Sequence, residues 1–96
     1  MNVTVGLPSA LRELARGEKA VVVELGDDGS ATVATVLDAL AAQLPAVERR
    51  IRDEAGVLRR HVNVFVGEAN IRDGAGLAEP LSDGSEIQVI PAVSGG

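Results

Sequence analysis

The residues of this sequence with the most distinctive chemistry are its last two, Gly95 and Gly96. Glycine has no Cβ, so two glycines in succession form a thin and conformationally permissive thread. Such a thread can enter a narrow channel in a partner enzyme and present its terminal carboxylate to ATP, whereas larger side chains would collide with the channel walls. The alternative is an inert end, because chain termini are commonly poorly ordered. The rest of the sequence must decide between the two.

The other residues capable of chemistry do not form a catalytic pattern. The sequence has a single histidine, His61, and no cysteine. A histidine without a second histidine or a converging pair of carboxylates does not predict a metal site or a catalytic triad. Asp27, Asp28 and Asp83 stand among turn-forming residues. Residues 74–76 lack the strand, helix and lysine of a phosphate-binding loop. We therefore expect that the chain is not an enzyme and binds no metal or cofactor of its own.

Composition predicts one small domain. The 96 residues leave room for a single core, and a hydrophobic fraction of 46% is too high for an intrinsically disordered chain. No apolar run reaches the ~18 residues of a membrane span, and the first residues do not form a secretory signal. These features predict a soluble, cytoplasmic protein that does not contact membranes.

The charge pattern disfavours nucleic acid as a partner. The formal net charge is −5, so phosphate backbones are repelled overall. Arginines nevertheless gather between residues 49 and 60, where Glu48, Asp53 and Glu54 stand among them. We interpret this segment as a solvated face whose charges compensate one another. A protein partner of this acidic domain is expected to present a basic surface. The clustered arginines are Arg49, Arg50, Arg52, Arg59 and Arg60.

The first 25 residues predict a β-hairpin. Val3, Val5 and Leu7 alternate with polar or small residues, which is the period of a half-buried strand. Residues 19–25 form a second strand rich in valine. The polar residues 12–19 between the two strands are expected to form a turn.

An amphipathic helix follows the hairpin. Its apolar residues recur with helical spacing, Thr32 or Ser30 can cap its first amides, and Pro45 ends it. Val47 and Ile51 predict a further turn or two of helix. The apolar stripe consists of Val33, Val36, Leu37, Leu40 and Leu44.

The C-terminal third predicts strands again. Residues 62–66 and 87–91 alternate as two strands. Residues 67–70 are expected to turn, and Ile71 to begin a short edge segment.

A hairpin, one crossover helix and a returning C-terminal strand are the layout of the β-grasp fold, in the α+β class. We expect a mixed sheet of four to five strands with one main helix across one face, since that helix must bury its apolar stripe. A ferredoxin-like arrangement would need a second long helix, which residues 46–58 do not supply. The domain is predicted to span residues 1–91, and residues 92–96 to form a flexible tail ending in Gly-Gly.

A patch that binds partners is predicted near the start of this tail. Phe65 and Ile90 lie on strand faces opposite the buried valines, and one helix can cover only one face of the sheet. If the two strands are neighbours, Phe65, Ile90 and Pro91 form an exposed apolar patch, and such patches mark partner sites. The alternative is that Phe65 packs in a secondary cluster under residues 68–81.

Three segments together resemble one protein family. These are Thr32-Val33 at the helix start, Leu81-x-Asp83-Gly84, and the ending Ile90-Pro91-Ala92-Val93-Ser94-Gly95-Gly96. They resemble the ubiquitin-like sulfur carriers of the MoaD/ThiS family, and the resemblance covers essentially the whole chain. The length and residues 1–5, 62–66 and 91–96 lie nearest the CysO-type carriers. Ser85 departs from a commonly acidic position. Ala92 replaces a proline often found in molybdopterin synthase subunits, which weakens that assignment.

The resemblance implies a carrier. In the family, an adenylyltransferase of the ubiquitin-activating type, similar to MoeB, MoeZ or ThiF, uses ATP and magnesium to adenylate the terminal carboxylate, here that of Gly96. Sulfide or a persulfide then displaces AMP, and the resulting thiocarboxylate donates its sulfur. A cysteine synthase, a thiosugar synthase or a similar biosynthetic enzyme would accept it. The carrier is expected to be a monomer when free. Residues that would thread through the partner's active site are Ala92, Val93, Ser94 and Gly95.

Three other functions stay open on the sequence alone. A ubiquitin-like modifier uses the same activation to join its terminal glycine to lysines of target proteins. The small subunit of molybdopterin synthase donates sulfur from the same group. A β-grasp interaction module with an inert tail is the last.

Overall fold

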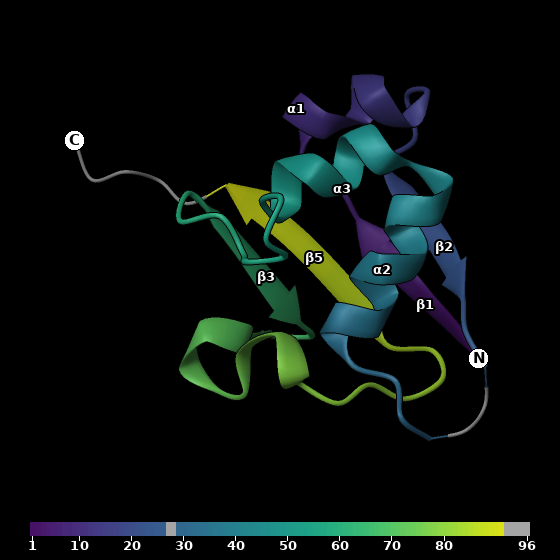
Figure 1. Ribbon diagram of the computed structural model, residues 1–96. Coiled ribbons are helices and arrows are strands. Elements are labelled where there is room, and N and C mark those ends of the chain that lie inside the picture. The colour runs from purple at the N-terminus through teal and green to yellow at the C-terminus, as the bar shows by residue number, and fades with distance from the viewer. Residues whose placement is uncertain (27–28, 92–96) are drawn as a thin grey trace.

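The computed structural model describes residues 1–26 and 29–91 (Figure 1). Its strands are β1 Asn2–Gly6, β2 Ala20–Glu24, β3 Val62–Val66, β4 Ala69–Asn70 and β5 Glu86–Pro91. They form one five-stranded sheet in the order β2-β1-β5-β3-β4. β1 is antiparallel to β2 and parallel to β5, and β5 is antiparallel to β3. This mixed sheet confirms the predicted β-grasp fold. The predicted tail, residues 92–96, lies outside the described residues.

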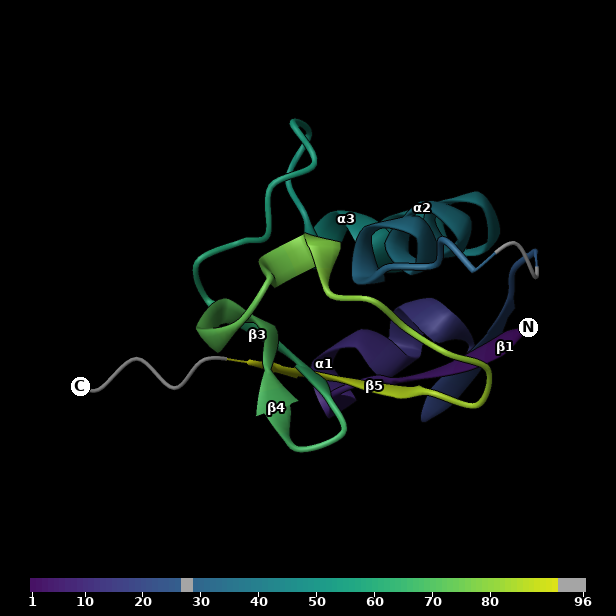
Figure 2. The same cartoon turned by 90° about the horizontal axis from the view of Figure 1, so that it is seen from below.

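The main helices lie together on one side of the sheet. These are α2 Val33–Gln43 and α3 Pro45–Ile51 (Figure 2). Val3 and Val5 of β1 and Ile87 and Val89 of β5 point to this side and are at most 1% exposed. The predicted apolar stripe of α2 packs against these strand residues, and its Val33, Val36, Leu37 and Leu40 are fully buried. The core therefore occupies one layer between the sheet and the two helices.

Helix α2 begins and ends where the sequence predicts. Thr32 is the N-cap: its Oγ1 accepts a hydrogen bond from the Thr35 amide at 3.3 Å, and its own amide donates to Thr35 Oγ1 at 2.8 Å. This reciprocal pair satisfies amides that the helix leaves without partners. Leu44 is the C-cap, and Pro45 starts α3 because a proline at the first helical position gives up no helical hydrogen bond.

The sequence prediction for the connection between β1 and β2 is wrong. In place of a simple turn over residues 12–19, the chain forms a short helix α1 Ser9–Arg12 and a 3-10 turn η1 Glu13–Ala15. Leu11 and Ala15, four residues apart, turn toward the core, and Ala15 is only 2% exposed. The helical spacing of these two apolar residues was overlooked because polar residues surround them in the sequence. Only Arg16 and Gly17, both with positive φ, form the predicted turn.

The edge strand also differs from the prediction. β4 is Ala69–Asn70, earlier than the predicted start at Ile71, because Gly67 with φ of 59° allows a tight turn straight after β3. Ile71 is 1% exposed and begins the 3-10 turn η2 Ile71–Asp73. A second one, η3 Gly76–Ala78, follows and brings Leu77 against the core.

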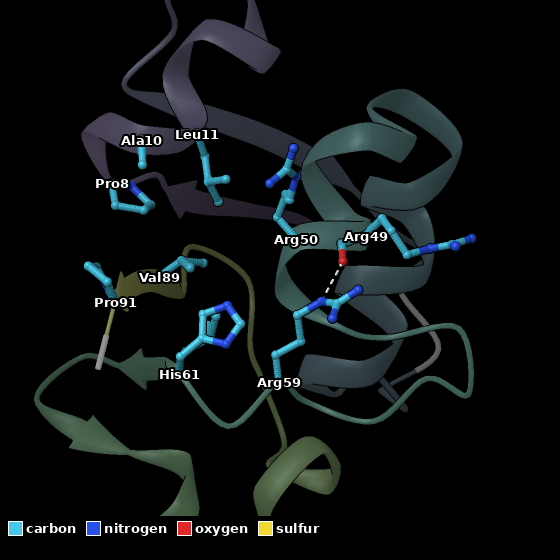
Figure 3. A pocket seen from close by; sticks show the side chains of 10 residues that line it. Pro8, Ala10, Leu11, Arg49, Arg50, Arg59, His61, Val89 and Pro91 are labelled. Carbon is cyan, nitrogen blue, oxygen red and sulfur yellow. Dashed lines mark hydrogen bonds between the residues drawn. The ribbon is translucent and has the colours of Figure 1, made fainter. Parts of the chain in front are cut away.

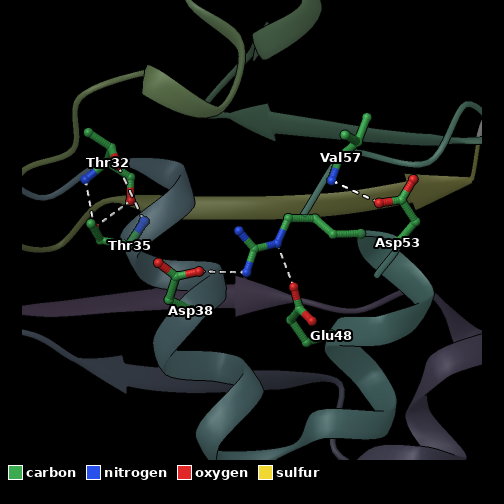
Figure 4. A network of polar contacts seen from close by, with 7 residues as sticks. Thr32, Thr35, Asp38, Glu48, Asp53 and Val57 are labelled. Carbon is green, nitrogen blue, oxygen red and sulfur yellow. Dashed lines mark hydrogen bonds and ion pairs between the residues drawn. The ribbon is translucent and has the colours of Figure 1, made fainter. Parts of the chain in front are cut away.

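Arg52, the C-cap of α3, forms a buried ion pair with Glu48 of the same helix and a partly exposed one with Asp38 of α2 (Figure 4). Arg52 Nε donates to Glu48 Oε1, and Arg52 Nη2 donates to Asp38 Oδ1 at 2.8 Å. Arg52 and Glu48 are each 8% exposed, so the predicted solvation of this face is wrong for both, although their charges compensate each other as predicted. Burial lowers the pKa of Arg52, but the hydrogen bonds and charges of Asp38 and Glu48 outweigh it, and the pKa lies above its ordinary value.

Candidate functional site

The candidate site is the end of β5, from which the chain continues to the Gly-Gly terminus. Pro91 is the last described residue. Gly96, predicted to carry the reactive carboxylate, lies outside the described residues. So do the residues predicted to thread into the partner, which are Ala92, Val93, Ser94 and Gly95. The geometry at this end of the domain is set by β5 and its neighbour β3.

Strand alternation divides the predicted patch between two faces. Ile90 pairs with Asn63 and Gln88 with Phe65, so these four residues point away from the helices. Phe65 and Ile90 are diagonal neighbours on this side, which we call the open face. Pro91 pairs with Val62, whose side chain is 6% exposed, and so lies on the helix side. The structure thus brings together Phe65 and Ile90 but not Pro91, since each step along a strand reverses the face.

Phe65 is half-buried and does not belong to the core cluster. It lines a hollow beside β4. The hollow carries three acidic side chains, Glu68, Asp73 and Glu79. We call it the acidic hollow; its residues are Phe65, Glu68, Ala69, Asn70, Asp73, Gly74 and Glu79. Phe65 therefore lies beside residues of the 68–81 segment, as the alternative prediction expected. Ile90, at 38% exposure, is the more open member of the pair.

Gly6 shapes the open face next to β5. Gly6 pairs with Gln88 in the parallel ladder. A Cβ on residue 6 would collide with the side-chain amide of Gln88. The absence of a side chain on Gly6 lets Gln88 lie across β1. The sequence alone does not reveal this contact, because it depends on which strands are neighbours.

A second surface lies on the helix side of the same strand end (Figure 3). It is a groove of about 450 Å³ between α1, α3 and the ends of β3 and β5. Apolar residues line its floor and basic residues its rim. We call it the basic groove; its residues are Pro8, Ala10, Leu11, Arg49, Arg50, Arg59, His61, Val62, Val89 and Pro91. Sequence reasoning missed this groove and treated residues 49–60 as self-compensating; the clustering of the arginines was the available signal.

Two further observations bound the chemistry of the described residues. In residues 1–26 and 29–91, no group of three or more histidine or acidic side chains is placed to hold a metal ion. Among the helices of this part of the chain, none combines the length and the apolarity that a bilayer span needs. His61 stands at the groove rim with arginines rather than carboxylates around it.

Comparisons with known proteins agree with the fold. The model of the ThiS family matches residues 5–96. The sulfur carrier protein CysO of Mycobacterium tuberculosis is 37% identical over 98 residues, which cover 100% of both chains. Small archaeal modifier protein 1 of Haloferax volcanii is 42% identical over 81 residues, covering 83% of this chain and 85% of that protein.

A solved structure extends the agreement to three dimensions. The crystal structure of the BexX/CysO complex of Amycolatopsis orientalis contains a chain that is 33% identical to this one. It superposes with a TM-score of 0.83 over 98% of this chain and 99% of that one. The resemblance drawn from the helix start, the turn and the C-terminal residues is confirmed along the whole length. This protein belongs to the ThiS family.

Proposed function

We propose that this chain is a sulfur carrier protein whose Gly96 carboxylate is converted to a thiocarboxylate. The observation that carries the proposal is the end-to-end similarity to a protein named as a sulfur carrier, 37% identical over 100% of both chains. The sequence agrees chemically, because it contains no cysteine that could hold sulfur and ends in Gly-Gly.

The first step activates a poor electrophile. An oxygen of the Gly96 carboxylate attacks the α-phosphorus of ATP, pyrophosphate leaves, and an acyl-adenylate forms. ATP and magnesium belong to the activating enzyme, an adenylyltransferase of the ubiquitin-activating type. The second step replaces AMP by sulfur. Sulfide attacks the carbonyl carbon directly, whereas a persulfide first gives an acyl disulfide that a second thiol must cleave.

The role of the folded domain in this proposal is recognition. Phe65 and Ile90 offer apolar surface on the open face, diagonal to each other across β3 and β5. A large aromatic side chain at the centre of a contact often dominates the energy of an interface. We propose that the activating enzyme covers this pair. The acidic hollow beside Phe65 supports a basic surface on that enzyme, as the net charge of −5 already indicates.

The thiocarboxylate then supplies sulfur to biosynthesis. It is a soft nucleophile that is ionised at neutral pH, and it attacks an electrophilic carbon held by a second, cytoplasmic enzyme. The product that we favour is cysteine, which a cysteine synthase would form from the acceptor of the sulfur. A thiosugar or another sulfur-containing metabolite is the variant of the same chemistry.

Intact mass after incubation with ATP, magnesium, sulfide and the adenylyltransferase tests the proposal. Replacement of oxygen by sulfur changes the mass nearly as oxidation of Met1 does, so mass alone is ambiguous. An alkylating agent resolves this, because the chain has no cysteine and only a thiocarboxylate reacts rapidly. We expect one adduct on the C-terminal peptide, absent from a variant lacking Gly95 and Gly96. No adduct with an enzyme that is active on another carrier would disprove the proposal.

A second candidate function has a specific observation in its favour. The 42% identity to small archaeal modifier protein 1 favours a protein modifier that joins Gly96 to lysines of target proteins through an isopeptide bond. This function uses the same adenylate. Lysates expressing the tagged chain would then show a ladder of conjugates that disappears on deletion of Gly95 and Gly96.

A further inference from the structure

We propose that the basic groove binds an acidic segment of a partner protein, in which carboxylates flank one apolar side chain. The partner we assign is the activating adenylyltransferase, and in that respect the inference rests on the proposed function. The proposal concerns a surface separate from the open face, on the other side of β5. Charge, preorganisation, shape and position support it in turn.

The first argument is that the charge in the groove is uncompensated. Arg50, Arg59 and His61 line it, and its lining residues include no acidic one. The acidic residues nearby in sequence are engaged elsewhere: Glu48 pairs with Arg52, and Asp53 Oδ1 accepts from two amides of its own loop.

Ion pairing in the structure confirms this imbalance. Among residues 1–26 and 29–91, both salt bridges belong to Arg52, with Asp38 and Glu48 as partners. Both of these carboxylates are thus engaged by Arg52, and neither lines the groove. A domain with a net charge of −5 therefore presents one locally positive surface, which attracts an anionic segment.

The second argument is that Arg59 is held in place before any partner arrives. Its amide donates to Ile51 O at 3.0 Å, and its carbonyl accepts from Arg72 Nη2 at 2.7 Å. Its side-chain Nε donates to Arg49 O at 2.8 Å, the bond drawn in Figure 3. The Arg49 side chain itself points away from the groove. Because Arg59 is already fixed at three points, binding a carboxylate costs less conformational entropy.

The third argument concerns the shape and polarity of the floor. Pro8, Leu11, Val89 and Pro91 supply apolar atoms at the bottom of the groove, with Arg50 and His61 on its sides. Such a floor suits an aliphatic or aromatic side chain, and the basic rim suits carboxylates on either side of it. Free phosphate would not use the apolar floor. A nucleic acid would extend beyond the groove onto the acidic remainder of the domain. An acidic–apolar protein segment uses both features.

The last argument is position. Pro91 lines the groove and is the final residue of β5. A segment bound there contacts the chain at the residue that precedes the tail. Binding at this point would fix the enzyme close to the group on which it acts, while the open face holds it from the other side of the strand.

Charge reversal at Arg50 tests the proposal, since the Arg50 side chain makes no hydrogen bond or salt bridge in residues 1–26 and 29–91. The affinity of the carrier for the adenylyltransferase encoded in the same genome is measured by calorimetry without ATP. Arg50→Glu should raise Kd at least tenfold and make Kd less dependent on salt concentration. Arg60→Glu is the matched control: Arg60 is exposed, lies next to His61 and does not line the groove. It should change Kd less than twofold. Equal effects of the two variants would overturn the proposal.

Alkylation of the wild-type thiocarboxylate, measured in the same samples, separates the two proposals. If the wild type is thiocarboxylated but Arg50→Glu binds like Arg60→Glu, the groove proposal fails and the sulfur-carrier function stands. If the wild type forms no thiocarboxylate, that function fails, and the groove is tested by titrating the ¹⁵N-labelled chain with the peptide acetyl-Glu-Asp-Leu-Asp-Glu-amide. Amide shifts at Arg50, Arg59 and Val89 that vanish in Arg50→Glu would support the groove. Scattered or absent shifts at millimolar peptide would overturn it.

Discussion

The two surfaces that flank the end of β5 differ in charge although one strand builds both. Ile90 points to the open face, near Phe65 and the acidic hollow, whereas Val89 and Pro91 point into the basic groove. Strand alternation separates neighbours in sequence by the thickness of the sheet. A partner that surrounds this strand end therefore meets an acidic rim on one side and a basic rim on the other. Such a charge pattern fixes the orientation of the partner as well as its identity.

The largest expected effect comes from Arg52, which binds two carboxylates outside the groove lining. Arg52→Ala leaves Glu48 buried without its partner, and breaking a buried ion pair in this way costs about 3–5 kcal/mol of unfolding free energy. Urea denaturation measures the loss.

The double variant Arg52→Met with Glu48→Leu is the control for this prediction. Replacing both charges with apolar groups of similar size is often neutral or stabilising. It should therefore retain most of the stability that Arg52→Ala loses. A loss below about 1 kcal/mol in Arg52→Ala would show that the pair is solvated after all, as the sequence predicted.

The Arg52 network shows where sequence reasoning reached its limit. The fold could be predicted because it depends on local periodicity: alternation in β1, β3 and β5, and one apolar stripe over Val33–Leu44. The side-by-side placement of Phe65 and Ile90 followed from the same alternation once β3 and β5 were taken as neighbours. The groove could not be predicted, because it depends on α1 and α3 meeting the ends of β3 and β5, which are distant in sequence. The Glu48–Arg52 pair has the four-residue spacing of a helix and could be read from the sequence, whereas the Asp38–Arg52 pair depends on how α2 packs against α3.

The next effect compares adjacent residues on the two faces of β3. Phe65→Ala should weaken binding to the adenylyltransferase about tenfold and cost roughly 1 kcal/mol of stability, since Phe65 is half-buried. Val64→Ala should do the reverse. Val64 is 0% exposed, so its truncation costs about 2 kcal/mol and leaves binding unchanged. Calorimetry and thermal unfolding of both variants provide the comparison. A large loss of stability in Phe65→Ala with normal binding would place Phe65 in a structural cluster instead.

A smaller effect is expected at the acidic hollow. Glu68→Gln removes one exposed carboxylate from its rim, and exposed charges contribute only about 0–1 kcal/mol. Affinity for the adenylyltransferase should fall two- to fivefold at low salt, by an order-of-magnitude estimate from that range, and the difference should vanish at high salt. The matched control is Glu18→Gln, which removes an exposed carboxylate just before β2, the strand at the opposite edge of the sheet from β4. If Glu18→Gln weakens binding equally, the effect reports net charge rather than a rim contact.

The smallest effect concerns Gly6, where the open face depends on a missing side chain. A strand glycine replaced by alanine gains about 0.5–1 kcal/mol of stability when the space is free. Here the new Cβ meets the Gln88 amide, a movable end of an exposed side chain, so Gly6→Ala should be close to neutral. In a Gln88→Ala background the collision disappears and the full gain should emerge. The two stability differences form a double-mutant cycle that isolates the contact.

In the single variant Gln88 must turn from β1 toward neighbouring side chains of the open face. This should weaken adenylyltransferase binding slightly and leave the response to Arg50→Glu intact. If Gly6→Ala stabilised both backgrounds equally, Gln88 would not lie across β1, and the open face would extend further toward β2 than the structure shows.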